Sequence, residues 1–112
     1  MIYKNYKKRF NDAEIYMLIN NFDVDKKHVY IGTTTNKSVR KYQHKRRCND
    51  PDDHGYYFKL YEYIRKTGGF DNWSMVMIEK FPCNNEKELN KRENYWIEYY
   101  NASLNTNNKY VY

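Results

Sequence analysis

Arg40, His44 and Glu93 are the side chains of this sequence that could together act on a phosphodiester bond. A carboxylate can hold a divalent metal ion, and the ion and an arginine can stabilise the charge that develops on the phosphorus. A histidine or a tyrosine can handle the proton of the attacking water. Arg40 and His44 lie one turn apart on a predicted basic helix, and Glu93 lies on another predicted helix. The set predicts phosphodiester hydrolysis if the fold brings both helices together.

Glu93 lies where a core residue is expected. In a helix over residues 86–100, Leu89, Trp96, Ile97 and Tyr100 share one stripe, and Glu93 is in its middle. Burial of an unpaired carboxylate costs free energy, so such a residue shifts its pKa, pairs with a cation or binds a metal ion. A structural ion pair with an Arg or a Lys is the alternative to a metal site here.

The predicted basic helix offers a surface for a polyanion. Residues 37–47 contain six Lys or Arg, His44 and no acidic residue, and the whole chain has 20 Lys and Arg against 14 Asp and Glu, a net charge of +6. Such a balance favours a nucleic-acid partner. Spacings of three and four predict one cationic face, and Val39 and Tyr42 are expected to pack on the other side. The predicted phosphate-binding residues are Lys37, Arg40, Lys41, His44 and Arg47.

The elements that must position these residues follow from hydrophobic periodicity. Strands are expected over 14–20, 28–34 and 73–81, the first two as a hairpin and the third, a continuous apolar run, covered on both faces. Helices are expected from Asn36 or Ser38 to Arg47, over 57–67 and over 86–100, and no element is expected after residue 100. The order ββααβα predicts an α+β domain. Its stop and cap signals are Gly68 for the second helix, and Asn85 with Glu88 for the third.

The length of 112 residues indicates one domain, predicted over 13–106, with a basic arm over 1–12 and a polar tail over 107–112. No apolar run is long enough to span a bilayer, so no membrane partner is expected. The first residues lack the apolar stretch of a signal peptide, which predicts an intracellular protein. Cys48 and Cys83 lie far apart with no CxxC, as is typical of reduced thiols.

Short motifs in a fixed order resemble those of the GIY-YIG endonuclease family. They are "EIY" at 14–16, "YIG" at 30–32, Arg40, His44, "KRENYWI" around Glu93, and "SLN" ending at Asn105. The resemblance covers nearly the whole chain. It implies a small three-stranded antiparallel sheet flanked by helices, and a nuclease that hydrolyses DNA with one divalent metal ion, Mg²⁺ or Mn²⁺.

The same resemblance implies a role for each matching residue. Tyr16 and Tyr30 correspond to the two motif tyrosines, one of which acts as general base. Arg40 corresponds to the arginine that contacts the scissile phosphate, and His44 to a histidine found in part of the family. Glu93 corresponds to the sole protein ligand of the metal ion. From its place on the inward stripe, we expect Mg²⁺ to be its partner in the active state and Arg40 in the metal-free state. Asn105 corresponds to a polar residue near the site and is a candidate nucleic-acid contact.

Other interpretations stay open at this point. A catalytically inactive nucleic-acid-binding module would keep the same fold and basic face, and a structural or interaction protein would use the basic residues for solubility. His44 could also make a structural hydrogen bond, and Asn105 could cap or turn the chain. A zinc site is the weakest alternative, because the spacing of its four candidate ligands matches no common finger. DNA is the expected partner. A second copy of this chain, in a homodimer, or a separate DNA-targeting protein is an additional expected partner. The four zinc candidates are His44, Cys48, His54 and Cys83.

Overall fold

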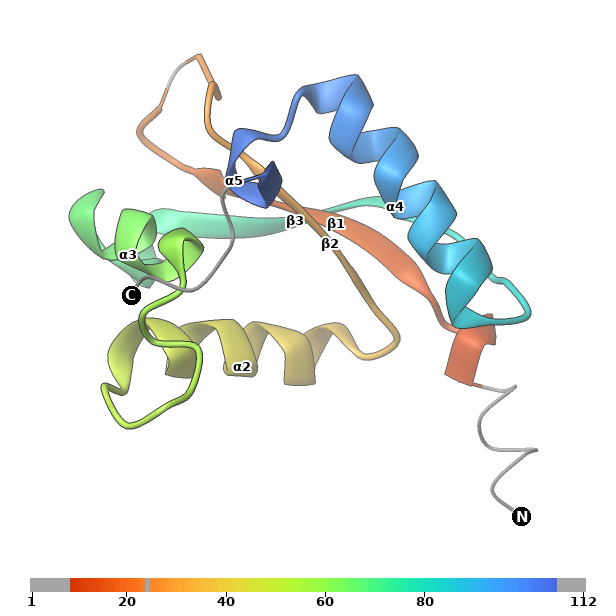
Figure 1. Ribbon diagram of the computed structural model, residues 1–112, viewed down its shortest axis with the longest axis horizontal. Coiled ribbons are helices and arrows are strands. Elements are labelled where there is room, and N and C mark those ends of the chain that lie inside the picture. Colours follow the sequence, from red (N-terminus) through yellow and green to blue (C-terminus); the bar gives the residue numbers. More distant parts are fainter. Residues whose placement is uncertain (1–8, 24, 107–112) are drawn as a thin grey trace.

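The computed structural model describes residues 9–23 and 25–106, and places helices on both faces of a three-stranded antiparallel sheet (Figure 1). The strands are β1 (Glu14–Asn20), β2 (Tyr30–Thr34) and β3 (Trp73–Lys80), in the order β2-β1-β3. The predicted α+β architecture is therefore confirmed. The predicted tail over 107–112 and most of the predicted basic arm, residues 1–8, lie outside the described residues.

Alternation along the strands divides the core into two halves. Tyr16 and Leu18 of β1 face one side of the sheet and pack with Ile64 of α3 (Lys59–Lys66). Ile15 of β1 faces the other side and packs with Leu89 of α4 (Glu86–Tyr100). Successive side chains of a strand point to opposite faces, so β1, the central strand, contributes to both halves. The second half also includes Phe10, from the described end of the predicted arm.

The register of the hairpin explains the glycine of "YIG". Gly32 of β2 lies opposite Tyr16 of β1. A Cβ atom at Gly32 would clash with Cζ and the hydroxyl oxygen of Tyr16. The absence of a side chain at Gly32 therefore allows the Tyr16 ring to lie across the neighbouring strand.

Polar caps fix the ends of the helices. Asn36 accepts a hydrogen bond from Val39 N at 3.2 Å, and so begins α2 (Lys37–Asn49). Gly68, with a φ of 103°, follows the end of α3 as predicted. Asn85 accepts from Glu88 N at 2.9 Å at the start of α4, while Glu88 bonds back to Asn84 N instead of Asn85 N. The short 3₁₀ helix η1 (Phe70–Asn72) leads into β3.

Two expectations about the elements need correction. β3 is only partly covered: Met75 and Met77 pack with one half of the core and Ile78 with the other, but Val76 is 38% exposed. The strand lies at an edge of the sheet, in the order β2-β1-β3. A short helix, α5 (Ser103–Thr106), follows α4 where no element was expected. Asn101 ends α4 in the left-handed conformation, and the chain then turns back to bury Ala102 and Leu104. None of the described helices combines the length and the apolar character needed to cross a bilayer.

Candidate active site

A chain of hydrogen bonds joins α2, β1 and α3 inside the protein. The Tyr16 hydroxyl lies 2.5 Å from His44 Nε2 and accepts a hydrogen bond from Arg40 Nε at 3.1 Å. His44 Nδ1 lies 2.8 Å from the Tyr61 hydroxyl. Tyr16 and His44 are both 0% exposed. Three of the predicted catalytic residues, Tyr16, Arg40 and His44, are thus joined by hydrogen bonds, and Tyr61, which no motif indicated, bonds to the other nitrogen of His44.

The network of Tyr16, Arg40, His44 and Tyr61 is neutral apart from its arginine. Burial, together with the charges of Arg40 and Arg47, lowers the pKa of His44 to about 3. Burial raises the pKa of Tyr16 far above its usual value, and raises that of Tyr61 to about 12. At neutral pH the two phenols and the imidazole are therefore uncharged. Their polar atoms are satisfied by one another instead of by water.

The orientation of α2 differs from the predicted one. Val39 and Tyr42, expected to pack, are 50% and 64% exposed, whereas His44 is completely buried. The hydrogen bonds with Tyr16 and Tyr61 satisfy both ring nitrogens, so burial leaves no polar atom of the imidazole unpaired. His44 is completely buried in this structure, so its predicted phosphate contact gains no support here and stays a prediction.

The predicted cationic face of α2 is split into two flanks by this rotation. Arg40 and Arg47 are half-buried near the phenols, where both act on the pKa of Tyr30. Lys37 and Lys41 border a separate hollow whose other wall is formed by methionines of β3. The residues predicted to share one face are therefore divided. Arg40, His44 and Arg47 lie toward the interior beside the phenols, and Lys37 and Lys41 lie on an outer flank of α2.

Tyr30, Arg40 and Glu93 come together beside β2. The Tyr30 ring lies 6.4 Å from that of Tyr16 and 5.9 Å from that of His44, measured between centroids. Burial raises the pKa of Tyr30, Arg40 acts in the opposite direction, and Glu93 adds to the rise. Tyr30 is 9% exposed and Tyr16 0%, so Tyr30 is the less completely buried of the two motif tyrosines.

Glu93 is half-buried and faces the sheet, as its position on the stripe of α4 predicts. Burial raises the pKa of its carboxyl group, and Arg40 partly offsets the rise. Within residues 9–23 and 25–106 the carboxylate has no hydrogen bond and no ion pair. Arg40, its expected partner in the absence of metal, donates instead to Tyr16 and to Gln43. An unpaired carboxylate of this kind suits a divalent cation, which prefers oxygen ligands.

A metal ion at this place would have one ligand from the described protein. No group of three or more His, Cys, Asp or Glu that could hold a metal ion occurs in the part of the chain that the structure describes. The zinc alternative therefore gains no support from the fold. A single carboxylate with open coordination positions instead resembles magnesium sites that are completed by water and substrate phosphates.

The sequence model of the GIY-YIG catalytic domain matches residues 13–110. The chain belongs to the GIY-YIG family. No curated protein and no solved structure matches the chain significantly. GIY-YIG domains are nuclease domains, generally dependent on a divalent metal ion, and a nuclease domain implies a DNA substrate. The resemblance of the ordered motifs is thereby confirmed.

This GIY-YIG domain has Glu14 in place of the first motif glycine. Glu14 lies in regular strand β1, opposite Thr34 of β2 and Lys80 of β3. Lys26 and Asn101 are the non-glycine residues of the described chain with a positive φ, so Glu14 is in an ordinary backbone conformation. The position therefore does not need a glycine here, and its charge lies across from that of Lys80.

The GIY-YIG asparagine, Asn105, bonds to the open edge of β2. Its side-chain oxygen accepts from Ile31 N, and its side-chain nitrogen donates to Ile31 O, both at 2.7 Å. The amide thus takes the place of a neighbouring strand at Ile31, between Tyr30 and Gly32. Asn105 fastens α5 to the strand that carries Tyr30, while its contact with nucleic acid stays a prediction.

A second set of contacts, which the sequence did not indicate, holds α4. Arg92 forms two hydrogen bonds to the Glu79 carboxylate, at 2.6 and 3.0 Å, and Trp96 Nε1 donates to the same carboxylate at 2.9 Å. Arg92 immediately precedes Glu93 in the sequence, and Trp96 follows it by three residues. This carboxylate clamp of Glu79, Arg92 and Trp96 therefore fixes the rotation of α4 that turns Glu93 toward the sheet.

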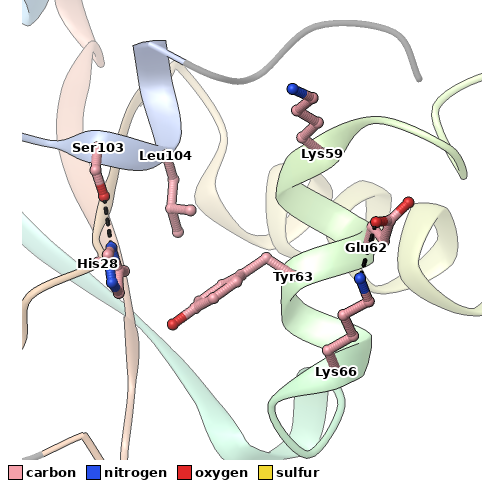
Figure 2. Close-up of a pocket in the computed structure, with 7 residues that line it drawn as sticks. All are labelled: His28, Lys59, Glu62, Tyr63, Lys66, Ser103 and Leu104. Carbon is pink, nitrogen blue, oxygen red and sulfur yellow. Dashed lines mark hydrogen bonds and ion pairs between the residues drawn. The ribbon is translucent and has the colours of Figure 1, made fainter. Parts of the chain in front are cut away.

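A cavity of about 430 Å³ between α3 and α5 lies apart from these groups (Figure 2). In it, His28 Nδ1 is 2.9 Å from the Ser103 hydroxyl, and Tyr63 extends from α3 toward His28. None of the residues predicted for the GIY-YIG site lines it. The lining residues are His28, Lys59, Glu62, Tyr63, Lys66, Ser103 and Leu104.

Proposed function

We propose that this protein is a DNA endonuclease that hydrolyses phosphodiester bonds with one divalent metal ion, Mg²⁺ or Mn²⁺, held by Glu93. The observation that carries the proposal is the half-buried Glu93 carboxylate, which lacks a partner in the described chain and lies close to Arg40 and Tyr30. A bound divalent ion would stabilise the negative charge that develops on the phosphate oxygens.

Arg40 would contact the scissile phosphate. A guanidinium has five N–H donors in a fixed plane, and the bonds to Tyr16 and Gln43 leave donors for phosphate oxygens. Tyr16 holds Arg40 through Nε and so sets the direction of the guanidinium. His44, which is completely buried in this structure, would assist through Tyr16.

Tyr30 would act as general base toward the attacking water. Tyr30 is less completely buried than Tyr16, whose hydroxyl is already bonded to His44 and Arg40, and this favours Tyr30. The positive charge of Arg40 favours the ionised form of Tyr30, against the effect of burial. Lys37 and Lys41, on the outer flank of α2, would contact the DNA backbone outside the cleavage position. The predicted contact of Arg47, which is half-buried beside the phenols, stays a prediction.

Plasmid nicking with Mg²⁺, with Mn²⁺ and with EDTA tests the proposal, with Glu93→Leu as the decisive variant. A leucine completes the apolar stripe of α4, so this variant should be at least as stable as wild type in EDTA while losing cleavage. Glu98→Leu, at an exposed position of the same helix, is the matched control and should keep cleavage. A Glu93→Leu protein that still cuts DNA, or that is markedly destabilised, contradicts the metal-ligand role.

The two tyrosines are separated by their pH–rate profiles. Tyr30→Phe should lower the cleavage rate by about 10² to 10⁴ and remove the rise of the rate with pH, because the base is gone. Tyr16→Phe should also slow cleavage but keep that rise. If both single variants and the double variant cut at the wild-type rate, neither tyrosine is the base. Salt-sensitive DNA binding without any metal-dependent nicking would favour the inactive binding module instead.

A further inference from the structure

The bond between His44 and Tyr61 extends the candidate site to a residue outside the GIY-YIG motifs. Tyr61 lies on α3, and its hydroxyl is 2.8 Å from His44 Nδ1. Its side chain is 2% exposed, and its ring stacks on that of Phe58 with centroids 6.2 Å apart. The hydroxyl is therefore held by a packed ring on a helix, which is a rigid support for an imidazole.

The donors and acceptors of the network determine where its protons lie. Arg40 bonds to Tyr16 and Arg47 to Tyr61, and an arginine can only donate, so each phenol hydrogen has a nitrogen of His44 as its acceptor. A neutral imidazole accepts only one of the two, and the shorter contact, 2.5 Å at Nε2 against 2.8 Å at Nδ1, assigns it to Tyr16. His44 is neutral, because burial and two nearby arginines lower its pKa to about 3. A neutral imidazole carries one hydrogen, so that hydrogen is on Nδ1 and is donated to Tyr61.

We propose that Tyr61 is a positioning residue for cleavage: it holds His44 in the Nδ1–H tautomer, so that Nε2 fixes Tyr16 and Tyr16 in turn aims Arg40 at the scissile phosphate. The inference rests on the proposed nuclease function. The contacts run from α3 through α2 to β1 and back to Arg40. Every link except the last joins buried groups, so a change at Tyr61 would reach Arg40 without altering the charge of the DNA-binding surface.

Tyr61→Phe removes the hydroxyl and keeps the stacked ring. We expect the cleavage rate at saturating DNA to fall by about 10- to 100-fold, the range typical of lost supporting hydrogen bonds, with the Kd for DNA unchanged. Tyr63→Phe is the matched control, because Tyr63 lies on the same helix but points into the separate cavity (Figure 2). A Tyr61→Phe enzyme as fast as the Tyr63→Phe enzyme overturns the inference.

A double-variant comparison distinguishes positioning from general destabilisation. If Tyr61 acts through His44, then Tyr61→Phe should cost nothing further in a His44→Gln background. Losses that multiply in the double variant would mean that Tyr61 acts by another route, and would overturn the inference.

A second readout needs no cleavage and no change at His44. Imidazole ¹⁵N shifts of the wild-type protein should report the Nδ1–H tautomer of His44, and those of Tyr61→Phe should report a mixture of tautomers. A wild-type Nε2–H tautomer, or an unchanged tautomer in Tyr61→Phe, contradicts the assignment. If the wild-type protein cuts no DNA, the nuclease proposal fails by itself, and the link between Tyr61 and His44 stands or falls on these shifts.

Discussion

α2 is held to β1 by hydrogen bonds among buried, mostly neutral groups, whereas α4 is held to β3 by an ion pair that solvent reaches. In the first region, Tyr16 and His44 are 0% exposed. In the second, the side chains of Arg92 and Glu79 are 32% and 25% exposed, and Arg92 holds down the pKa of the Glu79 carboxyl group. Both connections tether a helix that carries a proposed catalytic residue.

The difference shows which forces each tether depends on. A buried network loses much when one member is removed, because the remaining polar atoms find no water. An accessible ion pair is screened by salt, and water replaces a lost partner. The network therefore suits groups that must keep one protonation state and one geometry. The carboxylate clamp suits a helix that needs only a fixed rotation.

The largest effect is expected from a methyl group placed against the network. In Gly32→Ala the new Cβ would clash with the ring and hydroxyl of Tyr16, which cannot move without losing its bonds to His44 and Arg40. We expect a loss of about 3 kcal/mol in the free energy of unfolding, as for an overpacked core, together with loss of cleavage. Urea unfolding curves measure the first and nicking assays the second. Thr33→Ala on the same strand is the control, and equal midpoints for the two variants would contradict the assigned packing.

Acid should weaken the network before it affects the clamp. The pKa of His44 is about 3 in the folded protein against 6.5 in an unperturbed histidine, so between these values the unfolded state binds the extra proton. Stability should therefore fall with decreasing pH below 6.5, by about 1.4 kcal/mol per pH unit from this residue. Glu79 has a lowered pKa, and its contribution is lost only below 4.5. Urea midpoints between pH 7 and 5 measure the slope, which should shrink in His44→Gln.

Glu93 works against His44 in that pH range. Its pKa is raised, so the folded state keeps a proton that the unfolded state has released above pH 4.5, and stability rises as the pH falls into this window. The acid slope should therefore be steeper in Glu93→Leu than in wild type. A shallower slope in that variant would show that the Glu93 carboxyl group is not desolvated.

The clamp should give a smaller effect that salt removes. Glu79→Gln keeps the shape of the side chain and removes its charge, so we expect the Tm to fall by about 3 °C at low salt and to equal that of wild type near 1 M salt. Glu62→Gln, at the exposed ion pair with Lys66, is the control and should change the Tm less. A fall in Tm that persists at high salt would show that the clamp, like the buried network, does not depend on an ion pair that salt screens. Thermal melts across a salt series make the measurement.

The smallest effect is expected on the outer flank of α2. Lys37→Ala and Lys41→Ala should each reduce the slope of log Kd against log salt by about one unit, because each lysine would neutralise about one phosphate. The cleavage rate at saturating DNA should not change. Lys66→Ala, on α3, is the control. DNA binding that does not respond to salt would contradict the assigned surface.

Local patterns were sufficient for most of the elements. The alternation of Ile15, Met17 and Ile19 predicted β1 over 14–20, and the cap at Asn85 predicted α4 over 86–100, both with the observed bounds. The apolar run of β3 predicted contacts on both faces, which are only partial, and it did not indicate the edge position, since an edge strand and a central strand differ in their neighbours and not in their own composition. The helix α5 escaped prediction because its sequence is polar and its burial depends on a turn after Asn101.

The basic helix shows why a periodic pattern can mislead. Repeats of three and four in α2 place Lys37, Arg40 and His44 within one broad arc, a pattern that predicts a solvent-facing surface. Burial of His44 depends on hydroxyls that lie 28 and 17 residues away in the chain, on Tyr16 and Tyr61. Local sequence preferences do not encode partners that are remote in the chain. The periodic pattern therefore predicted which residues share a side of α2, but not whether that side faces solvent or the core.

By itself, the sequence determined the family, the types of the elements and the inward position of Glu93, because motif order and helical periodicity are properties of the chain alone. The tertiary structure decided that β2 lies at an edge of the sheet, where Arg40 from one face and Glu93 from the other come near Tyr30. It also decided that the histidine is neutral and bonded to two phenols. These outcomes depend on burial and on distances between remote segments, which exist only once the sheet and its helices have packed.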